Sequence, residues 1–365
     1  MHSNVAAAAL LTILSACGGG VETAALEVWH GGAQRVGHLG DAQDDFNLMG
    51  YASANALELS INGGPPMELT LADETFGFRR LGDVGHFNAD IPLDSLRAGD
   101  NELELVARGS KGSVTARVTL RKEYDELPLP FEVRWSEVTD PQDVGQYVDG
   151  EWQLEGTGAA AGLSNERALY DRLFLLGNRT WTDYDVTTTV RVNDVAAKTG
   201  PHSGAPGVGL ILRFAGHSVD PPRFPDAQPK WGFQPFGAIL WLRWTEGPDA
   251  LPELQFYRGD RNESQGVSWG AASLGAVTAR SAIRVRAQCA TDPDDSRTTT
   301  YGFKAWPVAD ASGAPVEEPS DWAFKIQQVS DTALRAGGVA LVAHHVDATF
   351  GDVAVRPLEN PGKDR

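Results

Sequence analysis

The sequence predicts an all-β chain that folds as two successive antiparallel β-sandwiches. Short runs along most of the chain alternate apolar and polar side chains, which is the period of a strand with one buried face. The 40 glycines and 21 prolines are spread along the chain, as expected for many short strands joined by turns. No amphipathic segment of ordinary helical length competes with these runs. A length of 365 residues favours two domains over one.

The N-terminus carries an export signature. The apolar run from Val5 to Leu14 is too short to span a bilayer, which needs roughly 20 residues, but it suits the core of a signal peptide. Leu14-Ser-Ala-Cys17 follows at once and resembles the lipobox of bacterial lipoproteins. The resemblance implies a signal peptide over residues 1–16, a lipidated Cys17 and a flexible, glycine-rich tether over 17–25. We therefore expect membrane anchorage in the bacterial cell envelope, on the outer membrane. The alternative is a disordered, alanine-rich terminus.

Composition narrows the possible partners and cofactors. The net charge of −18 argues against nucleic acid and anionic lipid surfaces, and it disfavours polyanionic glycans unless a basic cleft forms locally. Lipidation of Cys17 would leave Cys289 without a disulfide partner, and Cys-based zinc sites are excluded as well. No cofactor is expected. Asp292-Pro-Asp-Asp295 offers the hard oxygens that calcium prefers, but an acidic hairpin tip is the favoured interpretation.

Residues 26–122 predict the first sandwich. The run Ala56 to Ile61 alternates and stops at Asn62-Gly63, a strong hairpin signal, before the alternation resumes. About seven strands at this spacing are typical of an antiparallel sandwich. The segment Leu96-Arg-Ala-Gly-Asp-Asn101, with the strand that follows it, resembles the closing hairpin of bacterial Ig-like modules. The resemblance implies an Ig-like β-sandwich, which we expect to act as a spacer or accessory module.

Residues 123–130 separate the two predicted domains. This segment is acidic and contains Pro128 and Pro130, which cannot pair within a central strand. We expect a stiff linker here. Residues 131–358 should then fold on their own, with a short tail at 359–365.

Residues 131–358 are richer in tryptophan and contain more than ten strand-like runs, as in a large two-sheet jelly roll. The motifs are Tyr301-Gly-Phe-Lys-Ala-Trp306, Glu317-Glu-Pro-Ser-Asp-Trp322, Gly337-Gly-Val-Ala-Leu341 and Asp347-Ala-Thr-Phe350. Together they resemble the C-terminal strands of laminin-G/concanavalin A-like domains, including bacterial 3-keto-disaccharide hydrolase-like proteins. The resemblance implies a concanavalin A-like jelly roll. This scaffold serves lectins, glycan-active enzymes and adhesion modules, so it leaves function open.

No catalytic pattern is recognisable. The Glu-x-Asp-x-x-Glu strand of family 16 glycoside hydrolases begins only at Glu123-Tyr-Asp125 and is broken by Pro128. A Gly-x-Ser-x-Gly elbow is absent from the sequence. His344 and His345 are neighbours on a predicted strand, so we expect their rings to point to opposite faces and not to chelate one ion. Catalytic and metal-binding residues stay unassigned.

A candidate ligand site lies in the middle of the second domain. It consists of Arg213, His217, Trp231, Trp241 and Arg243. By alternation Trp241 and Arg243 share one face of a strand, whereas Trp244 lies on the other. Sugars stack on aromatic rings and accept hydrogen bonds from arginine, so this face is predicted to bind glycan. The alternative, in which the aromatic side chains fill the core and Arg243 pairs with an internal carboxylate, stays open.

We therefore expect an envelope lipoprotein that binds carbohydrate through its second domain. Two alternatives remain: a glycoside hydrolase-like enzyme on the same fold, and an adhesion or structural module with a protein partner. Two carboxylates about 5 to 9 Å apart across an open groove would favour the enzyme.

Overall fold

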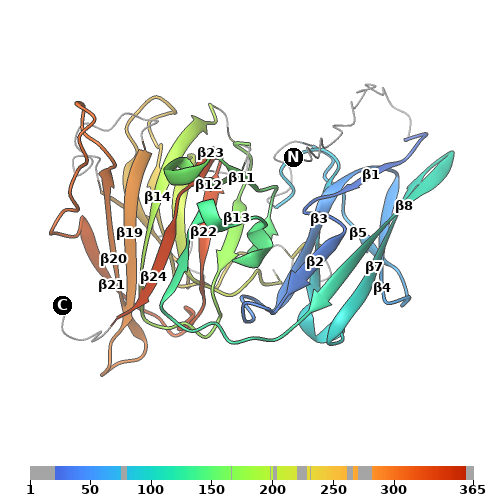
Figure 1. The fold of residues 1–365 in the computed structure, drawn as a ribbon, viewed down its shortest axis with the longest axis horizontal. Coiled ribbons are helices and arrows are strands. Elements are labelled where there is room, and N and C mark those ends of the chain that lie inside the picture. Colours follow the sequence, from blue (N-terminus) through green and yellow to red (C-terminus); the bar gives the residue numbers. More distant parts are fainter. Residues whose placement is uncertain are drawn as a thin grey trace.

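The computed structural model describes residues 21–74, 80–165, 167–197, 199, 204–219, 228–230, 232–260, 266–269 (backbone only) and 282–358. Within these ranges the chain forms two β-sandwiches that lie side by side (Figure 1), so the predicted all-β fold class is confirmed. The signal peptide, Cys17, Trp231 and the tail at 359–365 lie outside the described residues. In the described part of the chain, no helix is long and apolar enough to cross a membrane.

The first sandwich has sheets of three and five strands. The smaller sheet has the order β1 (Ala25–Val28), β3 (Asp45–Ser53), β6 (His86–Pro92). The larger has the order β2 (Ala33–Val36), β8 (Gly112–Lys122), β7 (Gly99–Gly109), β4 (Ala56–Ile61), β5 (Met67–Leu69), and β2 pairs with β8 in parallel. A short 3-10 helix, η1 (Leu93–Ser95), precedes β7. The alternate apolar residues of both sheets pack into one core.

The predicted Asn62-Gly63 turn is found where the sequence places it. Asn62 and Gly63 both have positive φ angles, 52° and 72°, the backbone that this hairpin turn requires. Asn62 then accepts the backbone N–H of Glu102, which fixes the turn against β7. β7 and β8 pair along their whole length down to Gly109 and Gly112, so a two-residue turn joins them.

The second sandwich consists of a seven-stranded and a nine-stranded sheet. The seven-stranded sheet has the order β10 (Gln146–Asp149), β13 (Arg172–Leu176), β22 (Gly338–His344), β15 (Gly207–Phe214), β16 (Ala238–Arg243), β17 (Glu253–Arg258), β18 (Gly266–Trp269). The nine-stranded sheet follows the order β11 (Gln153–Glu155), β12 (Gly162–Ser164), β23 (Val346–Phe350), β14 (Tyr184–Val195), β19 (Ala282–Thr291), β20 (Thr298–Pro307), β21 (Phe324–Val329), with β24 (Val353–Pro357) and β9 (Phe131–Val133) beside β14. Three 3-10 helices connect the early strands: η2 (Trp135–Glu137), η3 (Pro141–Asp143) and η4 (Gly158–Ala160).

The seven-stranded sheet is apolar on both faces. Its inner face, with Leu240, Leu242 and Trp244 from the β16 region, joins the main core between the two sheets. The outer face carries a second buried layer that includes Ile211, Ile239 and Trp241. The predicted alternation along β16 is confirmed, because Trp241 and Trp244 lie on opposite faces. The second layer positions the candidate site.

The three-stranded sheet of the first sandwich is buried on both faces. Phe87, Ala89 and Ile91 of β6 point into the core of the first sandwich. Asn88 and Asp90 alternate with them and bond to groups that belong to the second sandwich or to its loops. The two domains therefore meet across a buried polar interface.

The segment that joins the sandwiches is packed rather than free. Leu127 and Leu129 lie against the main core of the second sandwich. The carbonyl of Leu127 accepts the Trp181 Nε1–H at 2.7 Å. Trp29 and Met49 of the first sandwich also belong to that core, so apolar contacts accompany the polar ones between the domains.

Candidate functional site

Two glycines of β15 make room for the side chains at the candidate site. Gly207 lies opposite Arg243 in the β15–β16 register, and Gly209 lies opposite Trp241. A Cβ at Gly207 would lie 2.7 Å from Cδ of Arg243 and 3.0 Å from the Trp241 ring. A Cβ at Gly209 would lie 2.7 Å from Cβ of Trp241. The indole can therefore lie over β15 at Gly207 because this position lacks a side chain, and Gly209 permits the close approach of the β16 backbone.

Trp241 supports the guanidinium of Arg243. The guanidinium carbon lies 4.2 Å from the centre of the indole ring, within cation–π range. Trp241 Nε1 donates to Oε1 of Gln255 on β17 at 2.9 Å, which fixes the ring from the other end. Trp241 is 6% exposed, so it offers little surface for a stacked sugar. The partly exposed Arg243 is the group of this pair that reaches solvent.

Asp171 and His344 form a carboxylate–imidazole pair next to Trp241. Nδ1 of His344, the last residue of β22, lies 2.5 Å from Oδ1 of Asp171, which precedes β13. The ring centres of His344 and Trp241 are 5.9 Å apart. Burial alone would raise the pKa of Asp171, but His344 outweighs it and holds that pKa below its usual value. The Asp171 side chain is 17% exposed, so an ionised carboxylate reaches the surface here.

We call Trp241, Arg243, Gln255, Asp171 and His344 the Trp241 cluster. Four of its members lie on β16, β17 and β22, and Asp171 comes directly before β13. These four strands belong to one sheet. It combines a partly exposed planar cation and a partly exposed carboxylate with a buried imidazole behind them, on an apolar floor. Sites for small polar ligands combine these features.

The prediction that His344 and His345 point to opposite faces is wrong. Their ring centres are 4.5 Å apart, and both rings contact Tyr170. β22 ends at His344, and His345 has a φ of 55°, so the chain leaves the extended conformation between the two residues. The alternation rule holds only within a strand. A left-handed residue other than glycine costs about 1 kcal/mol or more, and such residues gather at functional sites.

Arg213 lies apart from the Trp241 cluster. It has a φ of 53° and lies at a shift in the β15–β22 register, which turns its side chain toward the nine-stranded sheet. The side chain is fully buried and donates to Asp183, to the hydroxyls of Thr291 and Thr299 and to the carbonyl of Thr182. Arg213 therefore shares no surface with Arg243.

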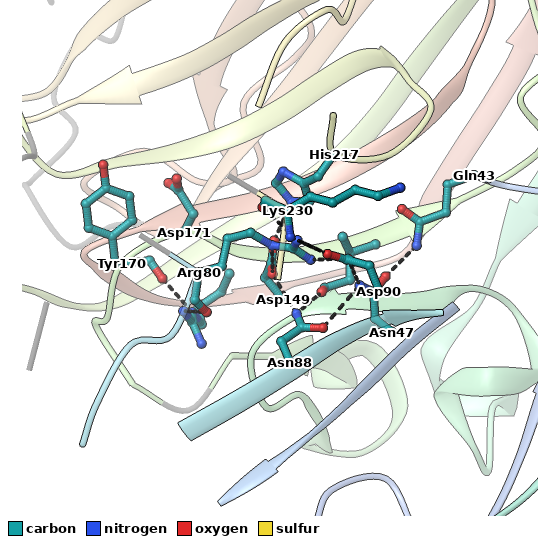
Figure 2. Close-up of polar contacts among 12 residues, drawn as sticks. Gln43, Asn47, Arg80, Asn88, Asp90, Asp149, Tyr170, Asp171, His217 and Lys230 are labelled. Carbon is teal, nitrogen blue, oxygen red and sulfur yellow. Dashed lines mark hydrogen bonds and ion pairs between the residues drawn. The ribbon is translucent and has the colours of Figure 1, made fainter. Parts of the chain in front are cut away.

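His217 belongs to a polar cluster between the two sandwiches. Its Nε2 lies 2.7 Å from Oδ2 of Asp149, while Asn88 donates to Oδ1 of the same carboxylate at 2.9 Å. Arg80 donates from Nε to Asp149 at 2.7 Å and through both terminal nitrogens to Asp90. Figure 2 shows Asp149 at the centre of these contacts. We call these five residues the interdomain network.

Asp149 is fully buried and has a complete set of partners. Burial alone would raise its pKa, but Arg80 and His217 outweigh that effect and hold the pKa below its usual value. Asp171 is the accessible carboxylate of this region, whereas Asp149 faces protein groups. These two aspartates therefore do not form an open pair of the kind that glycoside hydrolysis requires.

The acidic segment from Asp292 to Asp295 forms a hairpin tip. Asp292 accepts the backbone N–H of Asp294, and Asp295 accepts from Arg297 and Thr298. Across the described ranges, no group of three or more His, Cys, Asp or Glu side chains is arranged to hold a metal ion.

Sequence reasoning missed Asp171, Gln255 and the pairing of Asp171 with His344. One signal was available, because Tyr170-Asp171-Arg172 is a polar triplet directly before the apolar run Leu-Phe-Leu-Leu. Polar residues at the end of a buried strand lie at the rim of a sheet, where sites form. The interdomain network had no comparable signal.

Comparisons with known proteins identify similar folds. No family model matches the chain, and no curated protein matches it. The exoplasmic/lumenal domain of VIP36 with Ca²⁺ and Man2 bound is 10% identical, with a TM-score of 0.34 over 63% of this chain and 88% of that one. Lectin I-B4 from Griffonia simplicifolia is 8% identical (TM-score 0.35, 62% and 98% covered). The carbohydrate recognition domain of Emp46p is 12% identical (TM-score 0.33, 61% and 94% covered). Similarity at this level assigns no role to any residue of this chain.

Proposed function

We propose that this chain binds carbohydrate at the Trp241 cluster and does so as a lipid-anchored protein of the bacterial cell envelope. The observation that carries the first part is the guanidinium of Arg243, fixed on Trp241 in the same cluster as the ionised, partly exposed Asp171. Sugars offer hydroxyl groups that both donate and accept hydrogen bonds. A fixed donor next to a carboxylate acceptor matches that pattern.

The proposal gives Trp241 a supporting role. Its ring is buried between β15 and Arg243, so it holds the guanidinium in place instead of stacking on the ligand. A guanidinium that is already ordered loses less conformational entropy when it binds, which favours affinity. The tyrosine on the same face of β17, Tyr257, is partly exposed and pairs with Ile239 in the register. It offers an aromatic surface closer to solvent than Trp241.

A glycan array screened with the full chain tests the proposal. We expect the wild-type chain to bind at least one glycan and Asp171→Asn to lose most of that binding, because the amide removes the charged acceptor without changing shape. Asp295→Asn is the matched control, since Asp295 is an acidic residue of an exposed hairpin tip. Binding that is absent from every glycan, or equal in all three proteins, would contradict the proposal.

A second candidate function is proton-transfer catalysis on a bound glycan. The Asp171–His344 pair favours it, because a carboxylate bonded to an imidazole is the usual arrangement of a general base. The test is incubation of the full chain with any glycan that it binds, followed by product analysis. New reducing ends or unsaturated products that Asp171→Asn fails to form would establish an enzyme, and intact glycan would leave a binding protein.

A further inference from the structure

Arg243 lies over an aromatic ring but has no counter-ion among the residues that the structure describes. Its Nε is buried with no hydrogen-bond partner, and among the described residues no carboxylate lies within 4 Å of its guanidinium. Glu253 is its cross-strand neighbour on β17, yet no ion pair joins them. A desolvated cation without a partner is costly, so its retention calls for an explanation.

Arg286 provides the internal comparison. Its guanidinium carbon lies 5.7 Å from the centre of the Trp322 ring, on the nine-stranded sheet, so it too is an arginine over a tryptophan. Arg286 bonds to Asp185 and Glu318, each at 2.7 Å. Its charge is compensated within the protein. The charge of Arg243 is not, although both arginines sit on an indole.

Asp171, whose charge acts on Arg243, does not form an ion pair with it. Asp171 acts on Arg243 only at longer range, and its Oδ1 is 2.5 Å from His344. Burial lowers the pKa of Arg243 to about 10, opposed by Asp171, Tyr170 and Tyr257, so the side chain stays protonated at neutral pH. Arg243 therefore carries a positive charge that forms no ion pair within the described part of the chain.

We propose that Arg243 selects acidic sugars, with a uronic acid carboxylate supplying the counter-ion that no described residue provides. This inference rests on the proposed carbohydrate binding and names its ligand class. The planar fork of a guanidinium matches a planar carboxylate in a two-bond contact, which gives geometric as well as electrostatic selection. Trp241 lies against the guanidinium and Nε is buried, so a ligand carboxylate would bond to the two terminal nitrogens.

Because the chain is negatively charged overall, Arg243 can attract an acidic sugar only at short range. At −18 the protein repels anions at long range, but at physiological salt that repulsion is screened beyond about 8 Å. The contact with Arg243 is shorter than this distance. Acidic oligosaccharides should therefore bind by close fit, with modest weakening as salt increases.

The test uses uronic acid oligosaccharides and their methyl esters, which keep the ring and remove the charge. The panel covers several uronic acids and their neutral parent sugars, and affinities are measured by calorimetry on the full chain. We expect the wild type to bind at least one acid tenfold or more tightly than its ester. Arg243→Gln should lose that preference, Arg243→Lys should keep part of it, and Arg286→Gln should keep all of it.

The outcomes separate the two proposals. Equal affinity for acid and ester in the wild type, or an acid preference that survives in Arg243→Gln, would overturn the selection by Arg243 while carbohydrate binding stands. Failure to bind any sugar, charged or neutral, would remove both proposals together. The comparison of acid with ester in the wild type does not depend on how well the variants fold.

Discussion

Arg80 and Asp149 join the two sandwiches through a buried ion pair. Arg80 Nε donates to Oδ1 of Asp149 at 2.7 Å, and the two side chains are 3% and 0% exposed. Arg80 also bonds to both oxygens of Asp90 on β6, so one guanidinium compensates a carboxylate from each domain. Removing one partner from such a cluster leaves buried charges unpaired, which costs more than the cluster contributes when intact.

Arg80→Met should therefore destabilise the whole chain by about 3–5 kcal/mol, because Asp90 and Asp149 lose their shared cation. Urea unfolding of the full chain measures this loss. Arg117→Met is the control, since Arg117 pairs with Glu104 on an exposed surface where the loss is below about 1 kcal/mol. Equal losses in the two variants would show that the interdomain network is solvated rather than buried.

The packed interface also predicts how the domains unfold. Trp29 and Met49 of the first sandwich lie in the core of the second, and Leu127 and Leu129 of the joining segment pack against that core. We expect one cooperative thermal transition for the full chain. Residues 131–358 alone should melt at a lower temperature, because this apolar surface becomes exposed. Two separate transitions, or an unchanged midpoint for the fragment, would show that the domains are independent.

Stability should fall as the solution is acidified from pH 6.5 to 5. His30 stacks on Tyr147 across the interface with ring centres 3.5 Å apart, and burial lowers its pKa to about 3. The unfolded chain takes up a proton near pH 6.5 and the folded chain does not, so acid favours unfolding in this window. Burial also lowers the pKa of His86 to about 4 and that of His345 to about 3, which adds to the slope.

His30→Phe separates the contribution of His30 from the rest. Phenylalanine keeps an aromatic ring against Tyr147 and has no proton to gain. Unfolding free energies at pH 7, 6 and 5 should therefore show a shallower slope in this variant. Burial raises the pKa values of Asp185 and Asp347, but both aspartates are present in the variant and in the wild type, so their contribution cancels in the comparison of slopes. Identical slopes for the variant and the wild type would contradict a buried, neutral His30.

Cys17→Ser tests the predicted anchor. If the thiol carries a lipid, the variant should lose lipid labelling and move from the membrane to the soluble fraction of the bacterial cell. The wild-type chain expressed in the same cells is the control. Unchanged labelling and fractionation of the variant would remove the lipoprotein proposal and leave carbohydrate binding untouched.

Local sequence signals predicted much of the fold. Asn62-Gly63 predicted a hairpin because the turn needs positive φ at both positions, and the structure has it. The alternation along β16 placed Trp241 and Trp244 on opposite faces, as observed. Both inferences depend on residues close together in the chain. Where the chemistry is local, single-sequence reasoning succeeds.

Contacts between segments that are distant in the sequence could not be predicted. Asn88 and Asp90 alternate with apolar residues, a pattern usual for a solvent-exposed sheet face, yet the second domain covers them. His345 leaves the strand through a left-handed φ that its own residue type does not demand. The backbone there follows the tertiary structure, which periodicity cannot show.

Trp241→Ala should cost about 3–5 kcal/mol of folding free energy, because it removes a buried ring from the outer core layer. Trp322→Ala should cost less, since Trp322 is partly exposed. Thermal or urea unfolding measures both. The alanine variant would also leave Arg243 without its platform, so weaker sugar binding in that variant does not distinguish contact from support.

Trp241→Phe resolves this point. The smaller ring still covers β15 and still faces the guanidinium, but it loses the Nε1 donor to Gln255. If Trp241 only supports Arg243, the phenylalanine variant should fold and should retain sugar binding within about a factor of ten, since a cation on an aromatic ring contributes about 0.5–2 kcal/mol. If the indole itself contacts the sugar, binding should fall as far in Trp241→Phe as in Trp241→Ala. Sugar binding by Trp241→Phe therefore shows whether Trp241 supports Arg243 or contacts the sugar. We expect that it supports Arg243.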